Sequence, residues 1–256
     1  MRRIRAISHD ETAPLVDHLD ELRSRIVTSL AVFGVALALC FWQSDRLLEV
    51  ANAALPAGHE KLLTLGVTEP FTTTVTVSAY GAIILSLPII LYQLYAFLLP
   101  AFSREQQRTI LPLLLLIPAL FVAGVAFGYF VVLPAATGFL LNFNDSQFNV
   151  QVQAKDYYSF FAQTLLACGV VFQVPVGILA VTRLGIVRVE QLTGNRRYAY
   201  LVCAIVAAAL PGVDPVSMLL ETAPLIALYE LSIVLARFFG EPARSAIGSP
   251  AAAPDG

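Results

Sequence analysis

The 256-residue sequence is 57% hydrophobic and only 13% charged, and its mean hydropathy is +0.74. One water-soluble globule cannot hide that much apolar surface, so we expect an integral membrane protein. The net charge of −2 is uninformative about nucleic-acid binding, but the lack of a basic run with interleaved aromatic residues argues against it.

Uncharged stretches divide the chain into spanning units, because about 20 apolar residues cross a hydrocarbon core of about 30 Å. We predict an all-α bundle of six transmembrane helices, over about 26–44, 77–98, 110–132, 158–182, 198–210 and 216–236. These helices belong to one membrane domain, residues 1–240. The Pro- and Gly-containing segment 241–256 is expected to be a disordered cytoplasmic tail.

Two predicted helices are shorter than the uncharged runs that contain them. The threonine-rich segment 72–76 is too polar for lipid, so the second helix is predicted to start at about Val77. Pro134 and Gly138 are expected to end the third helix. The fifth helix has only thirteen residues and reaches about 20 Å. We therefore expect a concave bundle with short helices five and six, which thins the local bilayer.

Polar residues inside the predicted spans cost free energy when they are placed in lipid, so we expect each of them to have a structural or functional role. An ionised carboxylate at a helix centre costs roughly 2.5 to 3.5 kcal/mol on insertion scales, so Glu221 and Glu230 are expected to be shielded from lipid. Gln173 is the best candidate for a hydrogen bond to another helix. Gly124 and Gly128 form a GxxxG pattern, which is weak evidence of a dimer face.

Orientation follows from the cations, because positively charged connectors tend to stay in the cytoplasm. One set of connectors holds thirteen arginines and the other set holds only three cations, so both termini are predicted to be cytoplasmic. The thirteen are Arg2, Arg3, Arg5, Arg23, Arg25, Arg104, Arg108, Arg183, Arg188, Arg196, Arg197, Arg237 and Arg244; the three are Arg46, Lys61 and Lys155.

No catalytic or cofactor motif is present. The patterns GxSxG, HExxH, GxxxxGK[ST] and GxGxxG do not occur, and the three histidines lie in polar segments on different sides of the predicted membrane. The three cysteines lie in apolar segments without a CxxC spacing and are expected to pack as small hydrophobic residues. We expect no enzyme, no metal site and no cofactor.

A charged run, residues 17–25, enters the first predicted span. Apolar residues recur on it at helical spacing, which leaves Glu21 on the polar flank. In one interpretation Glu21 pairs with Arg25 at i,i+4 and solubilises the helix end. Alternatively, its carboxylate waits at the membrane surface for a guanidinium from a partner, because the two groups match as a planar, bidentate pair.

The first inner connector, residues 96–108, is the second region that stands out. It places aromatic surface, including Phe97, beside the carboxylate of Glu105 and the amide of Gln106. This segment is either an ordinary tight loop or part of a binding surface.

Residues 18–25 resemble the N-terminal HLxELRxR motif of the TatC family, the polytopic core subunit of the twin-arginine protein translocase. Four further matches follow in the same order between Leu15 and Phe239. They are Pro70-Phe71, Leu91-Tyr92-Gln93-Leu94-Tyr95-Ala96-Phe97, Phe127-Gly128-Tyr129-Phe130-Val131-Val132 with Pro134, and Phe172-Gln173-Val174-Pro175-Val176.

This resemblance implies a receptor and core component of a twin-arginine translocation complex in the inner (cytoplasmic) membrane of the cell. Such a receptor binds twin-arginine signal peptides at the cytoplasmic face, and the complex exports folded proteins with the proton-motive force. The implied partners are TatA- and TatB-type single-span subunits, signal peptides of folded cargo and further copies of the same subunit.

The resemblance also assigns site residues. The family's HLxELRxR glutamate corresponds to Glu21, which with Arg23 and Phe97 belongs to the implied signal-peptide site. A second family glutamate, in the first inner loop, falls on Gln106, with Glu105 one place earlier. This departure leaves open which of the two completes the site.

Three further positions belong to other parts of the implied machinery. Gln173 corresponds to the fourth-span polar position that contacts the small partner subunits in the family. Asp214 corresponds to the acidic residue of the short outer turn before the last span. Glu230 is the remaining acidic residue for which we expect a structural or functional role.

Two other functions would use the same residues. A secondary transporter of a small solute could line a polar path with Gln173, Glu221 and Glu230, although no internal repeat supports it. A membrane-embedded enzyme could use the cluster of Asp17, His18 and Glu21.

Overall fold

The computed structural model describes residues 13–56, 62–98, 116–143, 151–183, 186–211 and 214–239. These segments are helical apart from short connections and one isolated parallel β-bridge between Leu63 and Gln153. The helices are α1 (Ala13–Trp42), α2 (Ser44–Asn52), α3 (Glu69–Leu98), α5 (Leu116–Phe127), the π-helical turn η4 (Gly128–Val132), α6 (Leu133–Asn142), α7 (Ala154–Val171), α8 (Val174–Arg183), α9 (Val189–Gly194), α10 (Arg196–Ala209) and α11 (Pro215–Phe239).

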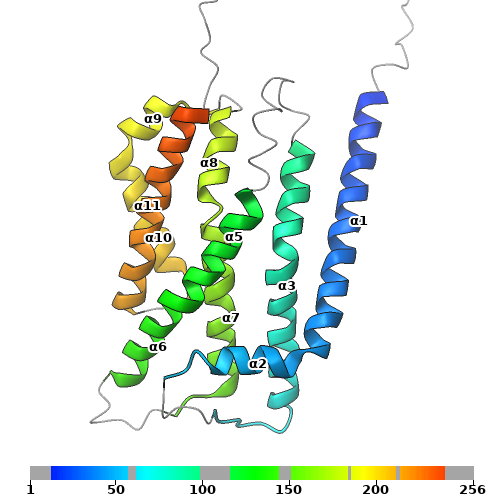
Figure 1. The fold of residues 1–256 in the computed structure, drawn as a ribbon, viewed down its shortest axis with the longest axis vertical. Coiled ribbons are helices and arrows are strands. Elements are labelled where there is room, and N and C mark those ends of the chain that lie inside the picture. Colours follow the sequence, from blue (N-terminus) through cyan, green and yellow to red (C-terminus); the bar gives the residue numbers. More distant parts are fainter. Residues whose placement is uncertain are drawn as a thin grey trace, which may run out of the picture.

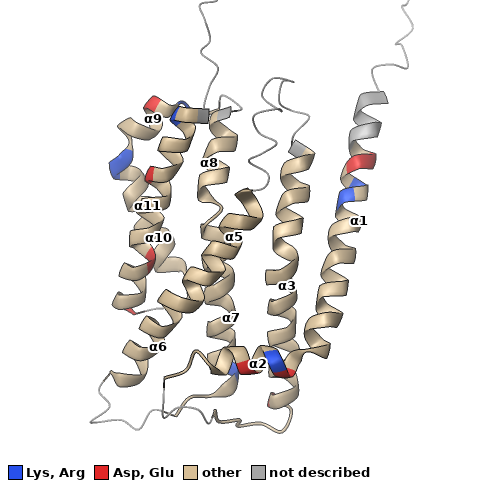
Figure 2. Ribbon diagram, in the orientation of Figure 1, with Lys and Arg blue, Asp and Glu red and all other residues tan. Residues whose placement is uncertain are grey.

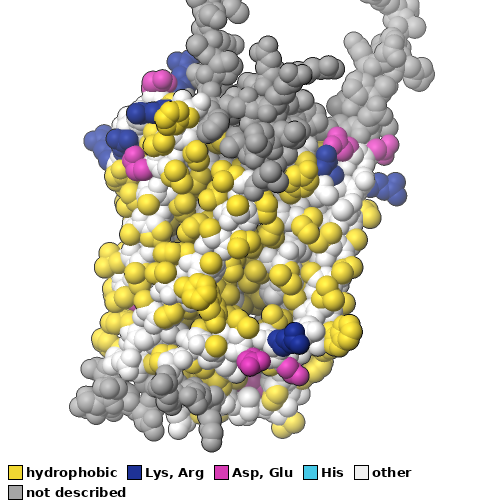
Figure 3. All heavy atoms as spheres, in the orientation of Figure 1, with side chains coloured by type: hydrophobic (Ala, Val, Ile, Leu, Met, Phe, Trp, Pro, Cys, Tyr) yellow, Lys and Arg dark blue, Asp and Glu magenta, His cyan; other side chains and the backbone are white. Residues whose placement is uncertain are grey.

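The described helices have the composition of a membrane bundle. Five helical stretches are long and apolar enough to cross a bilayer: Leu19–Trp42, Glu69–Phe97, Leu116–Asn142, Ala154–Thr182 and Pro215–Phe238. Most charged residues gather at the two ends of the bundle (Figure 2). On the face shown in Figure 3, hydrophobic side chains are spread over the surface between these ends, and few charged side chains lie there. The chain is therefore an all-helical membrane protein.

The helices run between the two ends of the bundle in alternating directions. In chain order these passes are α1, α3, α5 to α6, α7 to α8, α10 and α11, while α2 and α9 lie at opposite ends (Figure 1). The beginning of α1 and the end of α11 therefore emerge at the same end (Figure 1).

The last two passes differ in length. Helix α10 has 14 residues, with bounds close to the predicted 198–210. At 1.5 Å per residue it is about 21 Å long, less than the core of about 30 Å. Helix α11 has 25 residues, so the prediction of a short sixth helix is wrong.

Pro134 does not end the third pass, in contrast to the prediction. The helix continues through α6 to Asn142, and the π-helical turn η4 directly precedes the proline. A proline clashes with the carbonyl of the fourth residue before it, which is Phe130 here. Phe130 lies within η4, where the wider turn bonds the Leu133 N–H to the Gly128 carbonyl. The π-turn therefore accommodates the proline without breaking the pass.

Three other helix bounds also differ from the prediction. The pass predicted at 158–182 is broken at Phe172 and Gln173, between α7 and α8. Helix α1 begins at Ala13, thirteen residues before the predicted start at position 26. Helix α3 begins at Glu69 and includes the threonines. Hydroxyls of Thr72, Thr74 and Thr76 donate to carbonyls four residues earlier, which satisfies these polar groups within the helix.

Glycine contacts inside the bundle hold α5 against α7. A Cβ on Gly124 would lie 2.6 Å from the Cys168 carbonyl oxygen, and one on Gly169 would lie 2.6 Å from the Phe121 ring. A Cβ on Gly128 would lie 3.2 Å from the Cys168 side chain. The GxxxG glycines therefore face a neighbouring helix of the same chain, and the dimer-face interpretation is not needed. All three cysteines are buried and free, which confirms their expected role as small packing residues.

We predict that Gly124→Ala destabilises the protein by about 1–3 kcal/mol, because the added methyl group overlaps backbone that cannot easily move. The matched control is Gly34→Ala in α1, where nothing lies within 4 Å of the new Cβ and alanine favours the helix. Thermal unfolding of the detergent-solubilised variants measures both effects. Equal melting temperatures for the two variants would contradict the proposed α5–α7 contact.

Candidate functional site

The centre of the candidate site is an ion pair between Glu21 and Arg25 near the beginning of α1. The Nε and Nη2 atoms of Arg25 donate to Glu21 Oε1 at 3.0 and 2.6 Å. The pair is half-buried, with 24% of the Arg25 side chain and 35% of the Glu21 side chain exposed. The simpler prediction for Glu21, an i,i+4 pair with Arg25, is confirmed. The carboxylate proposed to bind a partner's guanidinium is therefore already bonded to a guanidinium of its own chain.

Helix α3 supplies the second partner of Arg25. The Arg25 Nη1 atom donates to Gln93 Oε1 at 2.9 Å, and the Gln93 carbonyl lies 3.5 Å from the same nitrogen. Three nitrogens of one guanidinium are thus used by α1 and α3 together, and α1 packs chiefly against α3. The sequence motif contains Gln93, but its spacing does not reveal this interhelical contact.

An apolar groove of about 360 Å³ lies beside the pair, between α1 and α3. Arg25 and Gln93 form its polar part, and Phe97 lies at the end of α3 that faces the beginning of α1. The remaining lining is apolar apart from Ser29; it consists of Leu22, Ile26, Ser29, Leu30, Phe33, Ile90 and Leu94. Phe97 and Arg25, the residue that pairs with Glu21, therefore line the same groove.

The other predicted members of this site are not brought to the pair. Arg23 is exposed, and two residues along a helix separate it from Arg25 by about 200°, so it lies on another face of α1. Glu105 and Gln106 lie outside the described residues, as do the side chains of Asp17 and His18. The structure thus describes one of the two expected guanidinium acceptors.

Gln173 lies at the break between α7 and α8 and is buried. Its Nε2 atom donates to the Ile117 carbonyl of α5 at 3.3 Å, which confirms the expected hydrogen bond to another helix. Its Oε1 atom has no hydrogen-bond partner among the described residues.

Two acidic residues of α11 and its approach lie inside the bundle. Asp214 is 5% exposed, and its Oδ1 atom accepts the Ser217 N–H at 2.8 Å, which is how an N-cap residue satisfies the first turn of a helix. Glu221 is 3% exposed, and neither carboxylate oxygen has a hydrogen-bond partner among the described residues. The expectation that protein shields Glu221 is confirmed. No described contact joins either residue to Glu21.

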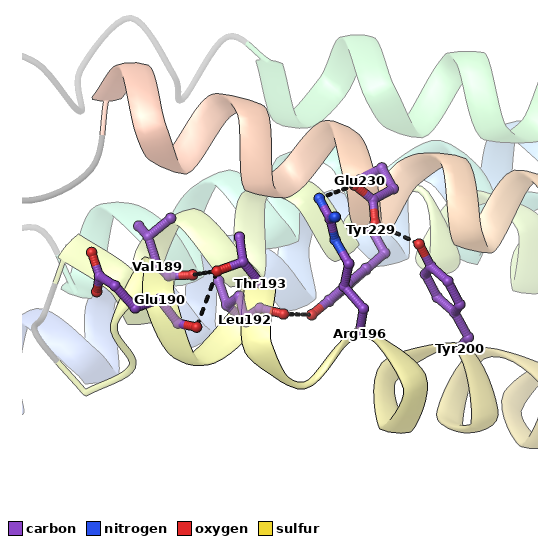
Figure 4. Close-up of polar contacts among 8 residues, drawn as sticks. All are labelled: Val189, Glu190, Leu192, Thr193, Arg196, Tyr200, Tyr229 and Glu230. Atoms are coloured by element: carbon purple, nitrogen blue, oxygen red, sulfur yellow. Dashed lines mark hydrogen bonds and ion pairs between the residues drawn. The ribbon is translucent and has the colours of Figure 1, made fainter.

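Glu230 of α11 is hydrogen-bonded to two residues of α10. It accepts hydrogen bonds from Arg196 Nη2 at 2.9 Å and from the Tyr200 hydroxyl at 2.6 Å (Figure 4). The neighbouring Tyr229 hydroxyl donates to the Leu192 carbonyl of α9 at 2.8 Å (Figure 4). These contacts explain how a carboxylate is tolerated in this pass, and they give Glu230 a structural role. The i,i+4 spacing of Arg196 and Tyr200 is the sequence signal for such an acceptor.

Glu69 has a comparable role at the opposite end of the bundle. Its Oε2 atom accepts the N–H groups of Leu65 and Gly66 at 2.7 and 3.1 Å, and its Oε1 atom accepts from Gln153 Nε2 at 2.9 Å. The carboxylate therefore ties the chain before α3 to the chain before α7. The sequence offers only one sign of this role, a glutamate in the first turn of a helix.

No group of three or more His, Cys, Asp or Glu residues in the described segments is arranged to hold a metal ion. What the described site shows is a carboxylate bonded to a guanidinium of the same chain, beside an apolar groove.

Comparison with known proteins connects this chain to a family. Residues 17–224 match the model of the family described as Sec-independent protein translocase protein (TatC). The TatC protein of Desulforapulum autotrophicum is 35% identical over 91% of this chain and 87% of its own length. The Escherichia coli K12 protein of that name is also 35% identical, over 91% of this chain and 92% of its own length.

A solved structure has the same fold. A crystal structure of the twin-arginine translocase receptor TatC superposes with a TM-score of 0.74 at 31% identity, over 87% of this chain and 99% of that chain.

We predict that Glu230→Ala lowers stability by about 1 kcal/mol, because it removes the acceptor for both Arg196 and Tyr200 while the half-exposed pair stays partly screened by solvent. The matched control is Glu190→Ala, which removes an exposed carboxylate on α9. Thermal unfolding in detergent is the measurement. If the two variants melt together, the contacts of Glu230 do not hold α10 to α11.

Proposed function

This chain belongs to the TatC family of Sec-independent protein translocase proteins, and we propose that the end of its bundle where α1 begins receives twin-arginine signal peptides. As a family member it is a component of the twin-arginine translocase, a protein-transport system, and not an enzyme. The proposal assigns Glu21 as an acceptor for one signal arginine, with Phe97 and Arg23 as neighbours. Glu105 or Gln106 accepts the other arginine.

The observation that supports this assignment is that Glu21 already holds a guanidinium. Two Arg25 nitrogens donate to Glu21 Oε1 within 3.0 Å, so the carboxylate is placed to bind the same group that a twin-arginine signal presents. The pair is half-exposed, which leaves a route for an incoming side chain. Charge-assisted hydrogen bonds of this kind contribute about 1.5 to 3 kcal/mol each.

The proposed orientation places both termini in the cytoplasm and the protein in the inner membrane of a bacterial cell. It is supported by the thirteen-to-three distribution of cations between the two sets of connectors. Among described residues, Arg23, Arg188 and Arg237 lie on the helix ends assigned to the inner side, whereas Arg46 and Lys155 lie in α2 and α7 at the other.

The remaining parts of the proposal concern the whole translocase. Folded cargo is exported with the proton-motive force, and TatA- and TatB-type single-span subunits are the partners, with Gln173 at a partner-helix contact. Helix α10 is about 21 Å long, which supports local thinning of the bilayer next to six spans in a concave arrangement.

We predict that Glu21→Ala abolishes export of a folded reporter with a twin-arginine leader, since loss of one charge-assisted contact weakens binding about 10- to 150-fold. The measurement is reporter export in a bacterial strain that lacks its own twin-arginine receptor. Glu49→Ala, an exposed glutamate of α2 at the other end of the bundle, is the matched control and should export normally. Normal export by Glu21→Ala, with normal amounts in the membrane, would defeat the assignment.

Photocrosslinking tests the contact itself. A photoreactive residue in place of the exposed Ser24 should crosslink to a leader with an arginine pair and far less to the same leader with a lysine pair. Equal crosslinking of the two leaders would show that this end of α1 does not read the arginines.

We predict that Glu105→Ala impairs export more than Gln106→Ala if the carboxylate of Glu105 supplies the second acceptor, because a carboxylate binds a guanidinium more strongly than a neutral amide does. The same export assay measures both. The opposite order would assign the second acceptor to Gln106, and normal export by both variants would remove this loop from the site.

A further inference from the structure

The guanidinium that holds Glu21 has the same chemistry as the side chain that the site is proposed to receive. We propose that Arg25 is a resident competitor for Glu21, which an arginine of the incoming signal peptide must displace to bind the Oε1 atom. This inference rests on the proposed function and concerns how the same site is regulated.

Geometry makes the two guanidiniums mutually exclusive at one carboxylate oxygen. Arg25 donates to Glu21 Oε1 through both Nε and Nη2, at 3.0 and 2.6 Å. An arginine that approached the same oxygen with a similar pair of bonds would overlap with Arg25. Two like charges at contact distance would also repel each other. Binding at Oε1 therefore requires Arg25 to leave.

The structure offers Arg25 a second partner when it leaves. Gln93 Oε1 accepts from Arg25 Nη1 at 2.9 Å, on the side of the guanidinium away from Glu21. The side chain is 24% exposed, so water can satisfy the nitrogens that Glu21 releases. A displaced Arg25 is thus not left as a buried, unpaired charge, which would make the exchange prohibitively costly.

The exchange has a consequence for the free energy of docking. Exchanging one guanidinium for another at Glu21 yields less free energy than binding to an unpaired carboxylate would, because the bonds to Arg25 are broken as the new ones form. A lysine loses in the exchange, because its ammonium group lacks the planar fork. The resident Arg25 therefore lowers the affinity of every signal that binds Oε1 of Glu21.

Removing Arg25 should therefore tighten binding. Affinity of the purified full-length protein in nanodiscs is measured by fluorescence anisotropy with two labelled leader peptides, which differ only in an arginine pair or a lysine pair. We predict that Arg25→Gln binds the arginine-pair leader about two- to fivefold more tightly, the range expected when a half-exposed ion pair no longer competes. Affinity for the lysine-pair leader should rise less, so selectivity for arginine widens.

Two controls separate competition from other effects of the lost charge. Arg237→Gln removes an exposed cation of α11 at the same end of the bundle but outside the proposed site; if loss of positive charge alone were the cause, this variant would tighten both leaders as much as Arg25→Gln does. In a Glu21→Gln background, Arg25→Gln should no longer tighten binding. Arg25→Lys keeps the charge without the fork and should give an intermediate affinity, and it serves if Arg25→Gln does not fold.

The results distinguish the two proposals. If the wild-type protein does not prefer the arginine-pair leader, or Glu21→Ala does not weaken its binding, the proposed function fails. If the wild-type protein shows that preference but Arg25→Gln binds the arginine-pair leader less tightly or unchanged, or tightens both leaders equally, only the competitor role of Arg25 is overturned.

Discussion

A backbone that crosses hydrocarbon has no water to bond, so each N–H and C=O must find its partner within the protein. The third and fourth passes show how the chain meets this requirement at prolines. Before Pro134 the helix widens into the π-turn η4, which shifts the carbonyl of Phe130 without ending the pass. Before Pro175 the α7 helix ends at Val171, the residue whose carbonyl the proline cannot bond, and α8 resumes three residues later.

The same requirement explains how three polar side chains, those of Glu69, Gln173 and Glu230, are accommodated in the bundle. Glu69 and Glu230 are tolerated because donors from other segments reach both of their oxygens. Gln173 is tolerated through one bond to the Ile117 carbonyl. Such contacts cross between helices that lie far apart in the sequence, so they fix the ends and the middle of the bundle relative to each other. Close packing at Gly124 and Gly169 then brings α5 and α7 together.

The sequence predicts the parts of this structure that depend on local composition. Uncharged runs locate every pass, and the bounds of α10 differ from the prediction by two residues at the start and one at the end. Helix ends are predicted poorly where a polar or breaking residue is satisfied by its neighbours. Thr74 and Thr76 of α3 donate to carbonyls of their own helix, and the π-turn accommodates Pro134. Neither feature changes the hydropathy that a sequence pattern reports.

In the candidate site, too, the sequence predicts the local contacts but not those between distant helices. The Glu21–Arg25 pair follows from i,i+4 spacing on one helix, so the sequence predicts it. The contact between Arg25 and Gln93 joins residues 68 positions apart, and the partners of Glu69 and Glu230 are equally remote. Such contacts depend on how the helices are placed, which one sequence does not specify.

A receptor that binds a cation at the membrane boundary needs another partner for its carboxylate when no ligand is bound. An unpaired, half-buried carboxylate would be costly there, because part of its water has been removed and nothing replaces it. Arg25 supplies that replacement with the same guanidinium chemistry that the ligand carries, and Gln93 on α3 keeps a hold on Arg25 from the other side. The empty site is thereby stabilised by a group that a signal arginine can match. A lysine ammonium lacks the planar fork of a guanidinium. It would therefore give Glu21 weaker hydrogen bonds than Arg25 already provides.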